Sequence, residues 1–113
     1  MPHIKIESSA QIKNPQELLT KLHNLLPEVG PFNISDIKSR IHYADHYRVA
    51  EGADEFIHCE IKILPGRNLE IKKSLTEQVL KLLCEECKTP AVKTSFSVEI
   101  CEIEKESYSK ISL

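Results

Sequence analysis

Two kinds of apolar spacing follow one another along this chain, and their order limits the folds that it can adopt. Leucines recur at helical spacing in residues 15–26 and 69–87. Before and after each of these stretches lies a segment in which apolar and polar residues alternate, as in half-buried strands: residues 2–7, 37–43, 56–63 and 96–100. The order strand, helix, strand therefore occurs twice, which predicts two βαβ units.

Local signals predict where the two helices begin and end. Asn14 is a typical N-cap residue, Pro15 suits the first helical position, and a glutamate follows three residues after the cap. Pro27, followed by a glycine and a further proline, predicts the end of the first helix. Asn68 is the N-cap expected for the second helix, which runs to Cys87.

Right-handed crossovers would place both helices on one face of a four-stranded mixed sheet, an α/β (α+β) fold built from a duplicated βαβ unit. We expect a single domain over residues 1–113, with one unit at about 2–43, a second at about 55–103 and a polar tail at 104–113. The other sheet face would stay uncovered. Burial of that face between identical subunits is one natural solution, and the tail is expected to lie against a neighbouring subunit.

Charge and hydropathy exclude some partners. The net charge of -2 and the pI of about 6.2 provide no basic surface for nucleic acid. No run approaches the roughly 18 apolar residues of a membrane span, and no signal peptide precedes the first strand. We therefore expect a soluble, cytoplasmic protein without membrane contacts. Its four cysteines are then expected to be reduced thiols: Cys59, Cys84, Cys87 and Cys101.

Several short segments, taken in order, resemble the 5-carboxymethyl-2-hydroxymuconate isomerases of the tautomerase superfamily, which includes 4-oxalocrotonate tautomerase and macrophage migration inhibitory factor. The resemblance runs through most of the chain. It rests on Pro2-His3 ahead of a strand with Glu7, Ile37 to Tyr43 with Asp45, Phe56-Ile57-His58, and Lys62-Ile63 leading to Gly66-Arg67-Asn68-Leu69-Glu70. The resemblance implies this fold as a homotrimer, without a cofactor.

What the resemblance implies for Pro2 is removal of Met1, so that the secondary amine of the proline becomes the catalytic base. The reaction implied is a keto–enol tautomerisation of an unsaturated 2-hydroxy or 2-oxo dicarboxylic acid, as in aromatic-compound degradation. The chemistry of the group agrees, because an N-terminal amine titrates near pH 8 and is lowered further by burial or nearby cations. A base works best when its pKa lies near the ambient pH.

A dicarboxylate substrate needs cations, and the planar fork of arginine fits a carboxylate better than lysine does. Arg67 and Arg40 are therefore the candidate catalytic cations beside Pro2. Lys38 stands where the family resemblance leads one to expect an arginine, and alternation places it on the same side as Arg40. We take Lys38 as a substrate-binding residue, together with His3, which adjoins the catalytic position.

Other interpretations stay open. A proline after methionine can signify only efficient methionine removal, Arg67 can be a solvated turn residue, and Lys38 or Arg40 can pair with glutamates across a subunit interface. A non-catalytic trimeric binding protein of the same fold is thus an alternative. A third hypothesis is a thiol-based redox or metal protein using Cys84-Glu85-Glu86-Cys87. That motif lies at the end of a helix, where the dipole disfavours a thiolate, and we expect no metal.

Overall fold

The computed structural model describes all 113 residues and contains the two predicted βαβ units. No helix in it has the length and apolar character that crossing a membrane requires. The elements, with two short 3₁₀ turns labelled η, follow in the order β1 (His3–Ser8), α1 (Pro15–Val29), η1 (Ile34–Asp36), β2 (Lys38–Tyr43), β3 (Glu55–Ile63), α2 (Leu69–Cys87), β4 (Thr94–Glu102) and η2 (Lys105–Ser107).

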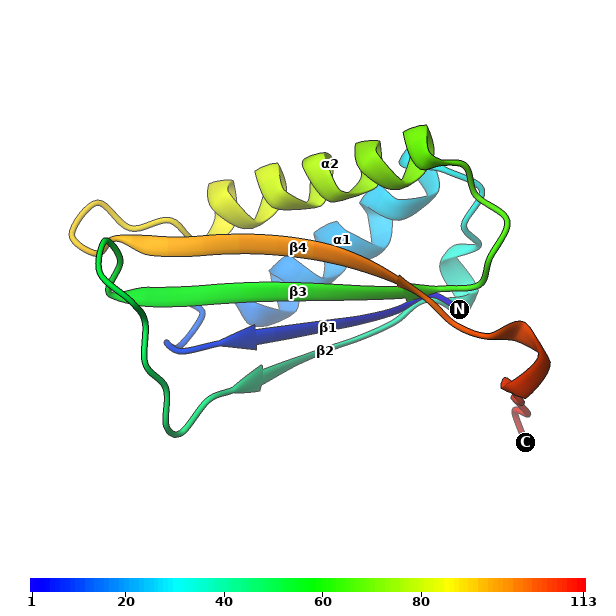
Figure 1. The fold of residues 1–113 in the computed structure, drawn as a ribbon, viewed down its shortest axis with the longest axis horizontal. Helices are drawn as coiled ribbons and strands as arrows, with labels where there is room; N and C mark the ends of the chain where they lie inside the picture. The colour runs from blue at the N-terminus through cyan, green and yellow to red at the C-terminus, as the bar shows by residue number, and fades with distance from the viewer.

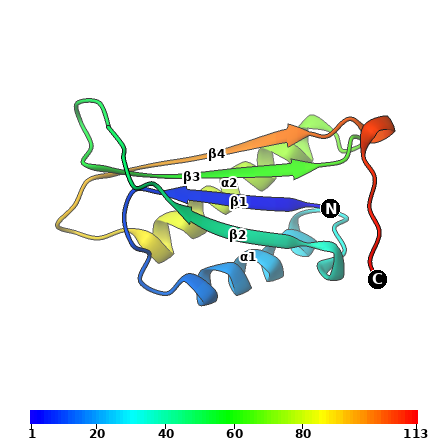
Figure 2. The same ribbon diagram turned by 90° about the horizontal axis from the view of Figure 1, so that it is seen from below.

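The four strands form one mixed sheet in the order β2-β1-β3-β4. Each βαβ unit contributes a parallel pair, β1 with β2 and β3 with β4, and the antiparallel pairing of β1 with β3 joins the two units. Both helices lie on one face of this sheet, as predicted (Figure 1). The termini lie near the same end of the sheet, and the tail runs past the N-terminus (Figure 2).

Of the predicted stop signals, Pro27 does not end the first helix, because α1 continues to Val29 with this proline inside it, whereas Gly30 does. A proline near the end of a helix removes only one late hydrogen bond, and the burial of Leu26 keeps this turn against the core. Gly30 ends the helix, with its N–H donating to the Leu26 carbonyl at 3.2 Å. Asn14 occupies the expected N-cap position without a side-chain cap bond, whereas Asn68 Oδ1 accepts from the Ile71 N–H at 2.9 Å.

Strand β4 extends beyond the predicted 96–100. It pairs in register with β3 from Thr94, opposite Glu55, to Glu102, opposite Ile63. The polar residues at both ends of β4 belong to the strand because they pair with β3. A pattern of alternating apolar residues cannot predict this pairing.

A single apolar core lies between the sheet and the helices. From the sheet it receives the alternating residues of β1 and β3, and from the helices it receives residues at three- and four-residue spacing: Leu18, Leu22 and Leu26 of α1 and Leu75, Val79 and Leu83 of α2. The opposite face of the sheet, called here the open face, carries polar residues of all four strands. It includes His3 and Lys5 of β1, Lys38 and Arg40 of β2, Glu60 and Lys62 of β3, and Glu99 and Cys101 of β4.

Two leucines test whether this core determines stability. Leu22 is 0% exposed and Leu69 is 75% exposed. We expect Leu22→Ala to lower the free energy of unfolding by about 2–5 kcal/mol because it leaves a cavity. Leu69→Ala is the matched control and should cost less than about 0.5 kcal/mol. Urea unfolding at one fixed protein concentration measures both, and equal losses in the two variants would contradict this description of the core.

Candidate functional site

Four segments meet at one end of the sheet, and together they form the candidate site (Figures 1 and 2). The Lys38 N–H donates to the Pro2 carbonyl at 3.1 Å, which holds the N-terminus beside β2. From the turn between β3 and α2, Arg67 Nη2 donates to the Pro31 carbonyl at 2.9 Å. The C-terminal tail contributes Lys110, whose Nζ lies 3.5 Å from Asp36 Oδ1. Residues far apart in the sequence thus surround the start of β1.

The N-terminus itself is partly withdrawn from water. The Pro2 side chain is less than 2% exposed, and the Met1 amine donates to the Asp36 carbonyl at 3.4 Å. Burial is the main reason why the pKa of this amine is lowered from 8.0, and the charge of Lys110 is the next. Lys38 and Arg67 also lower this pKa, while Asp36 raises it. The amine therefore lies in a region with an excess of positive charge.

Arg67 is held in a defined orientation by its surroundings. Besides the bond to Pro31, its Nη1 donates to the Leu64 carbonyl at 3.4 Å, and its Cζ lies 4.3 Å from the centre of the Phe32 ring. A Cβ on Gly30 would lie 3.1 Å from that ring, so the glycine makes room for it. The Arg67 Nε is buried and has no hydrogen-bond partner. The guanidinium is thus oriented by two carbonyls and an aromatic face, and its Nε–H is a buried donor without a partner.

His3, Lys38 and Arg40 lie together on the open face. Lys38 is paired with His3 across the β1–β2 ladder, and Arg40 with Lys5, so alternation correctly places the two cations on one face. Arg40 Nη1 lies 3.2 Å from His3 Nδ1. Burial, followed by the charge of Arg40, lowers the pKa of His3, so a neutral ring accepts this hydrogen bond. Lys38 is the cation next to the N-terminus, and Arg40 lies further along β2.

The single chain encloses no cavity at Pro2. Its largest hollow, of about 640 Å³, lies between α1 and β2, and Lys38 is the one predicted site residue that lines it. Neither Pro2 nor Arg67 lines any hollow in the structure. In the wall of the largest one, His23 Nε2 lies 2.7 Å from Ser39 Oγ, a pair that the sequence did not single out.

Comparisons with known proteins identify the family of this chain. The chain matches the sequence model of the 5-carboxymethyl-2-hydroxymuconate isomerase family over residues 2–112. The chain belongs to this family. It is 31% identical over 88 residues to the 5-carboxymethyl-2-hydroxymuconate Delta-isomerase of Escherichia coli, a match that covers 74% of this chain and 70% of that protein. The predicted enzyme class, an isomerase, is confirmed by the family.

Solved structures confirm the fold of the isomerase family. A 5-carboxymethyl-2-hydroxymuconate isomerase from Deinococcus radiodurans R1 superposes with a TM-score of 0.83 at 25% identity, covering 99% of this chain and 90% of that one. A fused 4-OT wild-type symmetric trimer superposes with a TM-score of 0.76 at 16% identity, covering 92% of this chain and 88% of that one. The second likeness shows the fold alone.

The four cysteines of this family member are free thiols. Burial, followed by the charges of Glu86 and Cys84, raises the pKa of Cys87 to about 11, so its thiol stays protonated at neutral pH. Burial also raises the pKa of Cys59 to about 12. Thiol chemistry depends on the thiolate, so these values disfavour the hypothesis of a redox protein.

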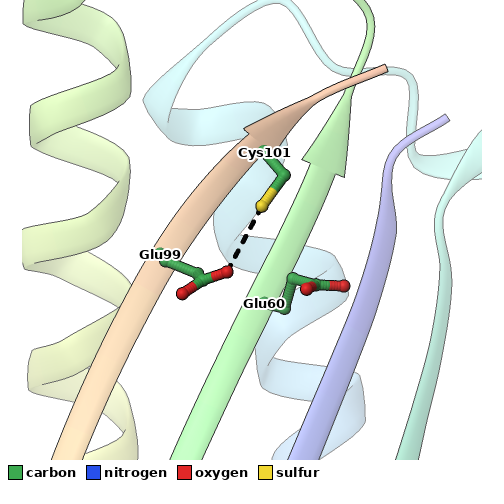
Figure 3. Close-up of side chains that lie close together, drawn as sticks. All are labelled: Glu60, Glu99 and Cys101. Atoms are coloured by element: carbon green, nitrogen blue, oxygen red, sulfur yellow. Dashed lines mark hydrogen bonds between the residues drawn. The ribbon is translucent and has the colours of Figure 1, made fainter. Parts of the chain in front are cut away.

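Three side chains on the open face could offer donor atoms to a metal ion, and the sequence analysis did not single them out. Glu60, Glu99 and Cys101 lie on two neighbouring strands, and their donor atoms lie within 4.8 Å of one another (Figure 3). The Cys101 thiol donates to Glu99 Oε1 at 3.3 Å, Glu99 also lies 3.3 Å from His58, and Glu60 lies 3.7 Å from Lys62. Each carboxylate therefore already has a partner within the protein.

Proposed function

We propose that this chain is a cofactor-independent keto–enol tautomerase that acts on unsaturated 2-hydroxy or 2-oxo dicarboxylic acids, in the manner of a 5-carboxymethyl-2-hydroxymuconate Delta-isomerase. The observation that carries the proposal is the cation-rich surroundings of the N-terminus, where Lys110, Lys38 and Arg67 lower the pKa of the Met1 amine and would act in the same direction on the adjoining Pro2 amine after Met1 is removed. The isomerase name of the E. coli relative supports the substrate class. Cytoplasmic aromatic-compound degradation is the setting that we propose.

The proposed reaction moves one proton and leaves the oxidation state unchanged. After Met1 is removed, the lone pair of the Pro2 nitrogen takes the proton of the enol O–H, which leaves a protonated amine and a dienolate. The O–H electron pair then forms the C=O bond, and a remote carbon takes the proton back from the amine. The product is an α,β-unsaturated 2-keto acid, and the neutral amine is restored. The step needs a free amine near neutral pH, which supports the choice of Pro2.

Arg67, Arg40 and Lys38 are the cations that we assign to the substrate and to the dienolate charge. Arg67 is oriented by its carbonyl bonds and by Phe32, so little side-chain freedom is lost when it binds a carboxylate. Lys38 adjoins Pro2 through its backbone bond and offers a point charge. His3, hydrogen-bonded to Arg40, is proposed to contact the substrate as a neutral ring.

We also propose a homotrimer as the active form. The open face carries Lys38 and Arg40 on β2 at one side and Glu99 on β4 at the other, while Glu60 of β3 is paired with Lys62. Opposite charges at its two sides suit cyclic contacts in which one side of a chain meets the other side of the next. The fused 4-OT symmetric trimer shares the fold, and the lone chain encloses no cavity at Pro2. A neighbouring subunit would then complete the site.

Replacement of the base tests the proposed reaction directly. After the mass of the N-terminus has shown that Met1 is absent, we expect Pro2→Ala to reduce the ketonisation rate of 2-hydroxymuconate by about 10²-fold or more. Pro15→Ala, at the start of α1, is the matched control and should retain the rate. In the wild type, kcat/KM should fall at low pH as the Pro2 amine becomes protonated, because protonation removes the base.

Two outcomes of this experiment would count against the proposal. Equal rates in wild type and Pro2→Ala, with Met1 absent, would refute the role of the amine. Absence of ketonisation in both, with a trimer that still binds dicarboxylates, would instead favour the non-catalytic binding protein.

Replacement of Arg67 by lysine tests whether the two-pronged guanidinium, and not only its positive charge, is needed to bind the substrate. Arg67→Lys should raise KM for 2-hydroxymuconate by about tenfold, because a point charge replaces a bidentate donor that is stacked on Phe32. Arg48→Lys, at an exposed position, is the control and should leave KM unchanged. Steady-state kinetics on variants with the wild-type melting temperature provide the measurement. A wild-type KM in Arg67→Lys would refute the assignment.

The proposed homotrimer predicts the molecular mass of the protein in solution. Sedimentation equilibrium should give three times the 12.9 kDa of the chain. Arg40→Glu, which reverses a charge on the basic side of the open face, should shift the equilibrium toward monomer, whereas Lys73→Glu on the exposed surface of α2 should not. A monomeric wild type at micromolar concentration would contradict the trimer.

A further inference from the structure

The C-terminal tail runs past the N-terminal site without a buried anchor of its own. Its start is fixed, because the Ile103 N–H donates to the Ile63 carbonyl at 2.8 Å and η2 follows. After Tyr108, whose N–H donates to the Lys105 carbonyl at 3.3 Å, no residue takes part in a backbone hydrogen bond outside helices and strands. The apolar side chains of this last stretch, Ile111 and Leu113, are exposed. Burial of apolar side chains therefore does not hold the end of the tail beside the N-terminus (Figure 2).

One charged contact connects the end of the tail with the site. Lys110 Nζ lies 3.5 Å from Asp36 Oδ1, and the carbonyl of the same Asp36 accepts the hydrogen bond from the Met1 amine at 3.4 Å. Asp36 stands two residues before Lys38, whose N–H donates to the Pro2 carbonyl at 3.1 Å, so Lys110 also lies near Pro2 after Met1 is removed. The side chains of the pair are 36% and 45% exposed, and ion pairs as exposed as this are weak. Another carboxylate can therefore replace Asp36 as the partner of Lys110 at little cost.

We propose that Lys110 is a further substrate-binding residue, which exchanges its contact with Asp36 for a carboxylate of the dicarboxylic acid bound at the N-terminal site. The proposal rests on the proposed function for the identity of that ligand. The Asp36 carboxylate marks a position near the amine at which an anionic oxygen lies within ion-pair distance of Lys110. A substrate with two carboxylates needs cations at both ends, and Lys110 adds one from a segment separate from those of Arg67 and Lys38.

The electrostatics of the free site agree with this placement. Among the charges that act on the Met1 amine, that of Lys110 lowers its pKa more than those of Lys38 and Arg67 do. Lys110 therefore lies near the start of the chain, where the Pro2 amine would be exposed by removal of Met1. A lysine that only tethered the tail far from the amine would have no such effect.

Binding of an unreactive dicarboxylate tests the proposal without turnover. Titration calorimetry with cis,cis-muconate at low salt should give a Kd about three- to fivefold higher for Lys110→Ala than for the wild type. Lys110→Arg should restore the wild-type Kd because it keeps the charge. The matched control is Lys105→Ala, which removes an exposed lysine of the same tail that takes part in no ion pair, and it should leave the Kd unchanged.

A pH profile separates a direct effect from a structural one. In Lys110→Ala the acid limb of kcat/KM for 2-hydroxymuconate should move to higher pH, because loss of a nearby positive charge would raise the pKa of the Pro2 amine. Lys105→Ala should show the wild-type limb. If Lys110 served only to stabilise the fold, Lys110→Ala would change the melting temperature and leave the acid limb of the pH profile in place.

The outcomes keep the two proposals distinct. An equal Kd for muconate in Lys110→Ala and Lys105→Ala, or no binding by the wild type, would overturn the role of Lys110. Pro2-dependent turnover combined with an equal Kd would overturn that role alone. A weaker Kd in Lys110→Ala, in a wild type that does not turn over 2-hydroxymuconate, would support the Lys110 contact and refute the tautomerase function.

Discussion

Strand β1 hydrogen-bonds to one neighbour in the same direction and to another in the opposite direction, and the rest of the structure depends on this double pairing. The parallel pair with β2 requires the crossover through α1, and the antiparallel pair with β3 joins the two βαβ units. Ile4 and Ile6 are fully buried, so a register shift of one residue would turn His3 and Lys5 into the core. The same register brings the Pro2 carbonyl to the Lys38 N–H, which fixes the N-terminus at the end of the sheet.

The fold could be predicted where local pattern and tertiary packing agree. The alternating and helical periods predicted all four strands and both helices. The predicted N-cap at Asn68 is confirmed, because its side chain accepts a hydrogen bond from the Ile71 N–H. The prediction failed where packing overrides a local signal. Pro27 lies inside α1 because Leu26 is packed in the core, and β4 reaches Glu102 because β3 provides its hydrogen bonds.

The candidate site was only partly accessible from the sequence. Pro2 and Arg67 were found through a family resemblance, since neither one proline nor one arginine identifies a site. Alternation placed Lys38 and Arg40 on one face, but the register was needed to show that Lys38 adjoins the N-terminus. Asp36 and Lys110 were missed, because a polar tail without periodicity gives no indication of which residue it will approach. They meet at the N-terminus because η1, which contains Asp36, lies directly before β2, and the tail that carries Lys110 follows β4.

The positive charges around the amine have two effects, and the proposed reaction links them. Lys110, Lys38 and Arg67 lower the pKa of the Met1 amine, and on the proposed mechanism the same charges favour the neutral, basic form of the Pro2 amine. A bound dicarboxylate neutralises part of this charge, so the proton affinity of the amine rises at the stage when the substrate offers its enol proton. A monocarboxylate neutralises less and raises that affinity less. On the proposed mechanism the second carboxylate therefore contributes to proton transfer as well as to binding, and selection for dicarboxylates would appear in kcat in addition to KM.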